Sequence, residues 1–270
     1  MRRLLFVLIH FFILQFANGQ VKFYNSENFA LQVKQIDEFI ERFNNSDCTL
    51  VKNYMHEKYN LTEVNRVDLI KSLFNYSDIV WNSEEVTQFL NDVTQSDEPI
   101  FLDFLDDDWY AELDCTGNYK GKSEKFKIIL KIEVNEKNQA VRWVIKSVYS
   151  EFLKLPQASN TKKTLNPAIH GTDFMGLNVA LIDYPNYYNY VAKDSNISQL
   201  LLFFNELKNK NLTFKQVDEI TYHFLQVKGW IFLVREFMRD TQNSGWLISS
   251  LFPIEEDDKR YYKKEKLHIF

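Results

Sequence analysis

The chain has 270 residues, of which 45% are hydrophobic and 16% aromatic, and its 37 acidic and 32 basic side chains give a formal net charge of −5. This length suffices for one large domain or two of ordinary size. The acidic balance, without a block of clustered lysines and arginines, excludes nucleic acid as a predicted partner, and the aromatic content excludes a disordered stalk.

Residues 1–19 have the pattern of an export signal. Arg2 and Arg3 form a short basic start, residues 4–16 are an apolar run, and small residues precede a cleavage site near Gly19. Thirteen helical residues at about 1.5 Å each are shorter than a bilayer core of about 30 Å, so no stable membrane anchor is expected. We therefore predict export, to the periplasm or the medium.

Helical spacing of apolar residues predicts three helices before residue 100. The first covers 29–43, with Phe29, Val33, Ile36, Ile40 and Phe43 on one face. The second covers 61–75. The third follows the capping residue Asn82, with acidic side chains in its first turn, and continues to 93.

The pattern then changes to the alternation that is typical of half-buried strands. Three strands are predicted, at 109–116, 126–134 and 141–149. Three helices followed by an antiparallel meander indicate an α+β fold, with helices packed on a curved antiparallel sheet. This first domain is predicted to occupy 20–154.

A second, smaller unit of a helix and a meander is predicted over 171–254, after a polar linker at 155–170. Its elements are a helix at 195–209 and strands at 219–227, 230–238 and 245–252. The last segment, 255–270, is dense in charges of both signs and is predicted to be a solvated C-terminal tail.

The element order of the N-terminal half begins with the helix at 29–43, which ends in Arg42-Phe43-Asn44, and continues with strand patterns at 110–117, 126–134 and 141–152. This half resembles the NTF2-like superfamily, in which a bent sheet forms a cone around a long first helix. The resemblance implies a cone-shaped α+β domain. It does not imply one activity, because members include isomerases, dehydratases, transport factors and accessory domains.

Enzymes of that superfamily need a carboxylate or histidine base inside the cone, and Asp114 and Glu112 are the weak candidates here. Both alternate to the strand face opposite Leu113. His170 and Asp173 flank a glycine and form a second candidate pair, a base with its orienting partner, although a structural turn is the favoured explanation because no nucleophile lies nearby in the sequence. Zinc-protease and serine-esterase motifs do not occur in the sequence.

The sequence predicts neither a metal nor a cofactor. The acidic residues around Asp103 and Asp108 do not fit an EF-hand loop, because the required glycine and the final glutamate are both replaced by aspartate. Cys48 and Cys115 are the two cysteines of the chain. In an oxidising compartment they can pair as a disulfide, whereas two buried free thiols are the alternative.

An aromatic segment, with tyrosines at Tyr184, Tyr187, Tyr188 and Tyr190, is a candidate ligand-binding loop. It would stack on a sugar or a peptide, or pack across the junction between the two units. The leading hypothesis is an exported, non-enzymatic binding or accessory protein for an unknown small molecule, glycan or protein. The alternatives are an isomerase- or dehydratase-like enzyme that uses a carboxylate in the cone, and a structural subunit of a cell-surface assembly.

Overall fold

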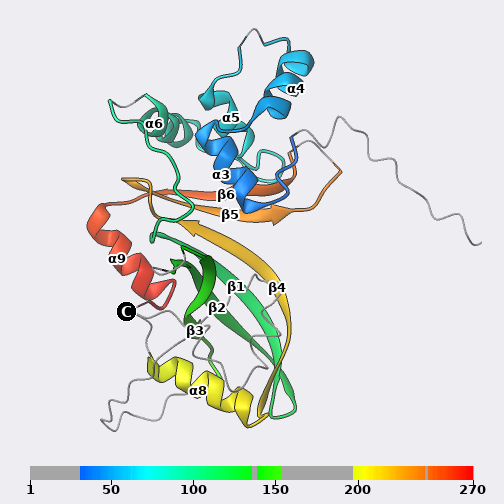
Figure 1. Ribbon diagram of the computed structural model, residues 1–270, viewed down its shortest axis with the longest axis vertical. Coiled ribbons are helices and arrows are strands. Elements are labelled where there is room, and N and C mark those ends of the chain that lie inside the picture. The colour runs from blue at the N-terminus through cyan, green and yellow to red at the C-terminus, as the bar shows by residue number, and fades with distance from the viewer. Residues whose placement is uncertain are drawn as a thin grey trace, which may run out of the picture.

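The computed structural model describes residues 31–61, 63–95, 97–135, 139–153, 197–240 and 243–269. The fold is α+β, as predicted, with one curved antiparallel sheet (Figure 1). The strands are β1 (Trp109–Tyr119), β2 (Lys122–Val134), β3 (Val141–Tyr149), β4 (Leu212–Phe224), β5 (Trp230–Phe237) and β6 (Gly245–Pro253). Their order in the sheet is β3-β2-β1-β4-β5-β6, so every neighbouring pair except β1 and β4 is consecutive in sequence.

Six helices surround the sheet in the part of the chain that the structure describes. They are α3 (Ile36–Asn44), α4 (Thr49–Tyr59), α5 (Arg66–Ser72), α6 (Ser83–Thr94), α8 (Ile197–Lys208) and α9 (Glu256–Glu265). Figure 1 shows α3 to α6 gathered at the end of the molecule beside β5 and β6, with α8 at the opposite end. The predictions of α6 and α8 are confirmed, whereas α4 was not predicted because Met55 is its one buried residue.

Two predicted helices are shorter than expected, because the chain beside each of them pairs with the edge of β6. Val33 forms a parallel bridge with Gly245, so the described chain before Ile36 is not helical. Phe74 forms a second parallel bridge, with Ile248, after α5 has ended. These bridges satisfy hydrogen-bonding groups at an edge that would otherwise be open, and they fix the N-terminal helices against the sheet.

The two predicted units share one sheet and one core in the described residues, which differs from the expectation of two separate domains. β4 pairs with β1 from Trp109 to Tyr119. Each half also supplies the helix that covers the other half's strands. Phe39 of α3 stacks on Phe224 of β4, with ring centroids 5.6 Å apart, and Phe203 of α8 lies 5.5 Å from Phe126 of β2. The predicted linker at 155–170 lies outside the described residues.

The segment predicted as a solvated tail instead contains α9, which packs on the outer face of the sheet. Leu267, just after the helix, is fully buried with Tyr110, Ile129 and Ile231 in a small apolar cluster. Lys259 of α9 is only 5% exposed. The prediction failed because the segment buries few apolar side chains and fixes itself mainly through polar contacts.

Arg66, the first residue of α5, ties the N-terminal helices together. Its guanidinium donates hydrogen bonds to the carbonyl oxygens of Phe43, Val93 and Ile100, and the Val93 bond measures 3.0 Å. Burial lowers the pKa of Arg66 to about 10, which leaves it charged at neutral pH. Its three contacts fix the position of α5, which forms the floor of the pocket described next.

Candidate functional site

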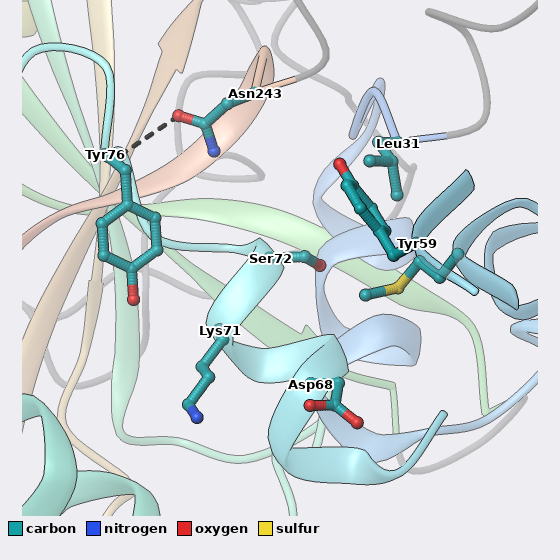
Figure 2. A pocket seen from close by; sticks show the side chains of 8 residues that line it. Leu31, Tyr59, Asp68, Lys71, Ser72, Tyr76 and Asn243 are labelled. Atoms are coloured by element: carbon teal, nitrogen blue, oxygen red, sulfur yellow. Dashed lines mark hydrogen bonds between the residues drawn. The ribbon is translucent and has the colours of Figure 1, made fainter. Parts of the chain in front are cut away.

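A pocket of about 360 Å³ lies among α4, α5 and the turn that precedes β6 (Figure 2). Eight residues line it: Leu31, Met55, Tyr59, Asp68, Lys71, Ser72, Tyr76 and Asn243. Its volume falls at the lower end of the range for small-molecule sites, about 300 to 1,000 Å³. The pocket is therefore large enough for a small ligand.

The floor of the pocket is one face of α5. The helix begins with a capping box, in which the Asn65 side chain accepts from the Asp68 amide and the Asp68 carboxylate accepts from the Asn65 amide, both at 3.1 Å. Its opposite face buries Leu69 and Ile70 completely. Packing on one side and a cap at the start leave Asp68, Lys71 and Ser72 facing the pocket.

Two tyrosine rings form the walls. Tyr59, the last residue of α4, is 50% exposed, and Tyr76, which follows α5, is 52% exposed. Figure 2 shows them on opposite sides of Ser72, with Leu31 beside Tyr59. Partial burial raises the pKa of Tyr76, so its phenol keeps its proton at neutral pH. Large aromatic rings left half exposed beside a cavity are suited to contact a ligand.

Asn243 fixes the wall that carries Tyr76. Its Oδ1 accepts from the Tyr76 amide at 3.2 Å and from the Ser77 hydroxyl at 3.4 Å, while its Nδ2 donates to the Phe74 carbonyl at 2.7 Å. The Tyr76 ring also packs on Phe74, with centroids 5.9 Å apart. The backbone of this wall is therefore held in place without a ligand.

The charged groups of the pocket are one carboxylate and one ammonium group, three residues apart on α5. Such neighbours lie on the same helix face, so their fields largely cancel at a distance. Within the described chain, no carboxylate forms an ion pair with Lys71, and its side chain is exposed. Lys71, and the Asp68 carboxylate oxygen that takes no part in the capping box, can therefore exchange contacts with water for contacts with a ligand.

The predicted catalytic candidates Glu112 and Asp114 lie elsewhere, on the outer face of β1. Glu112 is 9% exposed beneath α9, and Lys127 forms ion pairs with both carboxylates. His223 Nε2 lies 3.8 Å from Glu112 Oε2, and His223 Nδ1 is hydrogen-bonded at 2.8 Å to the Tyr262 hydroxyl of α9. The opposite face of β1, toward the enclosed core, is apolar.

The titration properties of this buried cluster favour a structural role. Burial, together with the positive charge of Lys127, lowers the pKa of His223 to about 3, so the ring is neutral at pH 7. Burial raises the pKa of Tyr262 above its usual value. His223 is hydrogen-bonded to the Tyr262 hydroxyl through Nδ1, whereas its buried Nε2 faces the Glu112 carboxylate and has no hydrogen-bond partner within the described residues. The cluster thereby attaches α9 to the sheet.

The remaining predicted site residues are separated or undescribed. Cys48 and Cys115 are free thiols buried in different apolar clusters, and their S–H groups face the carbonyl oxygens of Ser46 and Leu113, so the possible disulfide is not formed. The tyrosines of the predicted binding loop lie outside the described residues, as do His170 and Asp173.

Two aspartates of the acidic loop before β1 form ion pairs with lysines. Asp107 lies 3.7 Å from the ammonium of Lys131, and Asp108 pairs with Lys263 of α9. Across the described ranges, no group of three or more His, Cys, Asp or Glu side chains is arranged to hold a metal ion.

Comparisons with protein-family models, with curated proteins and with solved structures found no match. None of the helices in the described residues combines the length and the apolar character that crossing a membrane requires.

Proposed function

We propose that this is an exported, non-catalytic binding protein that holds a small ligand in the pocket between α4, α5 and the turn before β6. The observation that carries the proposal is the pair of half-exposed rings, Tyr59 and Tyr76, on opposite walls of a cavity of about 360 Å³. A concave site with a few polar groups among apolar walls is the usual form of a small-molecule site.

The frame of the pocket is ordered before a ligand arrives, which supports a binding role. Arg66 fixes α5 through three carbonyl contacts, and Asn243 fixes the backbone at Tyr76 through three more hydrogen bonds. Binding to a preorganised site does not have to offset the entropy of ordering its walls. Ligand affinity is then determined mainly by contacts with the side chains.

The chemistry of the lining supports binding without catalysis. Neither histidine nor cysteine occurs among the eight lining residues. The one aliphatic hydroxyl, on Ser72, donates its proton to the Leu69 carbonyl of its own helix at 2.6 Å and not to a side-chain base. Nucleophilic catalysis needs such a base within hydrogen-bond reach.

Export and the NTF2-like resemblance belong to the same proposal. The basic start and apolar run of residues 1–19 support export. The curved antiparallel sheet with helices on its enclosed face supports an NTF2-like scaffold, although in this chain α8, from the C-terminal half, contacts β3 and β4. In this proposal the scaffold holds α4 and α5 in place and takes no part in binding.

Ligand-observed NMR with a library of soluble small-molecule fragments tests the proposal. We expect fragments that bind the wild-type protein and no longer bind Ser72→Phe, which fills the pocket. The matched control is Ser123→Phe, at the exposed start of β2 near the β1–β2 turn. Fragments that bind all three proteins equally, or a library from which nothing binds, would overturn the proposal.

A further inference from the structure

We infer that the pocket's ligand is a neutral, polyhydroxylated molecule, a glycan of one or two sugar rings. This inference rests on the proposed function and gives the ligand a chemical class. Its basis is the combination in one small cavity of two aromatic walls, a floor with one acidic and one basic group, and hydroxyl groups from Ser72 and Tyr76.

The aromatic walls suit the weakly apolar C–H faces of a sugar ring. Tyr59 and Tyr76 each expose about half of the side chain, and Leu31 lies beside Tyr59. Leu31 and Met55 are both buried and add apolar atoms to the lining. A ring that lies flat against a tyrosine covers apolar area while its hydroxyl groups remain at the edge. The edge is where the polar floor of α5 lies.

The floor matches hydroxyl groups because it holds both acceptors and donors. Asp68 presents a carboxylate that accepts hydrogen bonds, and Lys71 presents an ammonium group with three donors. A hydroxyl group both donates and accepts, so neighbouring hydroxyls of a sugar can contact the two side chains at once. Charge-assisted hydrogen bonds of this kind are the stronger ones.

Other ligand classes fit this floor less well. A purely apolar ligand would remove Asp68 and Lys71 from water without replacing their hydrogen bonds. An anion attracted to Lys71 would be repelled by Asp68 one turn away, and a cation attracted to Asp68 would be repelled by Lys71. A neutral ligand with many hydroxyl groups has neither cost, and a volume of about 360 Å³ limits it to one or two rings.

The test is calorimetric titration of the purified full chain with neutral disaccharides: maltose, cellobiose, lactose and diacetylchitobiose. Two further probes are the zwitterionic dipeptide Gly-Tyr and an apolar naphthalene dye. We expect at least one disaccharide to bind, and Tyr76→Ala to weaken it about tenfold or more through loss of stacking. Tyr76→Phe keeps the ring and should weaken it only a few-fold.

The matched control is Tyr261→Ala, which removes an exposed tyrosine of α9 and should leave disaccharide affinity unchanged. Unchanged melting temperatures establish that the variants are folded. A disaccharide whose affinity is the same in wild type and in Tyr76→Ala would overturn the inference. Binding of the dipeptide or dye alone, lost in Ser72→Phe, would overturn the glycan class and retain the binding function. Failure of every probe and fragment would overturn both.

Discussion

The molecule has two polar clusters, one beneath α9 and one in the pocket over α5, and they differ in how their polar groups are satisfied. Beneath α9, Glu112 is paired with Lys127, and His223 Nδ1 is hydrogen-bonded to Tyr262, so that His223 Nε2 is the one nitrogen of the ring without a partner in the described residues. In the pocket, Lys71 has no ion pair in the described part of the chain. The same residue types therefore serve two purposes.

The difference between polar groups that protein covers and polar groups that face water indicates where a ligand would bind. A polar group that is already satisfied and covered by protein contributes to folding, and breaking its contacts leaves a buried group unpaired. Removing a polar group that faces water beside an aromatic surface costs the free protein little stability. We therefore expect substitutions beneath α9 to change stability, and substitutions in the pocket to change binding.

The largest expected effect is on α9. Lys259 donates to the carbonyl oxygens of Leu225 and Val227, each at 2.7 Å, and pairs with Glu256 at 2.8 Å. Lys259→Met leaves both carbonyls without this donor, so the free energy of unfolding should fall by about 3 kcal/mol. Denaturant titration measures it. Lys264→Met, at an exposed site of the same helix, should change it by less than about 0.5 kcal/mol.

The second effect is a pH dependence carried by His223. Burial lowers its pKa to about 3 in the folded state, below the usual value of 6.5, so between these two values the unfolded state binds more protons and stability rises with pH. Through this group alone, the free energy of unfolding should fall by about 2 kcal/mol between pH 8 and pH 5. His223→Gln, which can still bond Tyr262, should lack that component. Equal pH slopes in the two proteins would contradict a neutral buried His223.

The smallest effect on stability is expected in the pocket. Lys71→Met removes an ammonium group that faces the cavity, so it should change the free energy of unfolding by less than about 0.5 kcal/mol. The same denaturant titrations measure it. A loss of about 2 kcal/mol or more would mean that Lys71 stabilises the fold, and the contrast with α9 would disappear.

Most of the sheet could be predicted from the sequence. In β1, β2 and β3 apolar and polar residues alternate because one face of each strand packs against the core. The pairing of β4 with β1 could not be predicted, because pairing between segments that are distant in the chain produces no periodic pattern in the sequence. The same long-range contact explains why the two-unit expectation differs from the structure. The helices that carry Phe39 and Phe203 were assigned to separate units, yet each of these two side chains packs on a strand of the other half.

The candidate site was not predicted, for a physical reason. Its residues come from five short segments, and the pocket exists only because Asn243 meets the chain at Tyr76. The one available local signal was the capping pattern of Asn65 and Asp68, which predicts the start of α5 but not what its exposed face contacts. The charged segment containing Lys259 likewise resembles a solvated tail until its partners, backbone carbonyls, are known.

The most direct test of the pocket as the binding site is a map of backbone amide chemical shifts during titration with the disaccharide that binds best. We predict saturable shifts at Tyr59, Lys71, Ser72 and Tyr76, and unchanged positions for amides in α9. Shifts concentrated in α9 and β1, with the amides of α5 unmoved, would contradict the assignment of the pocket as the ligand site.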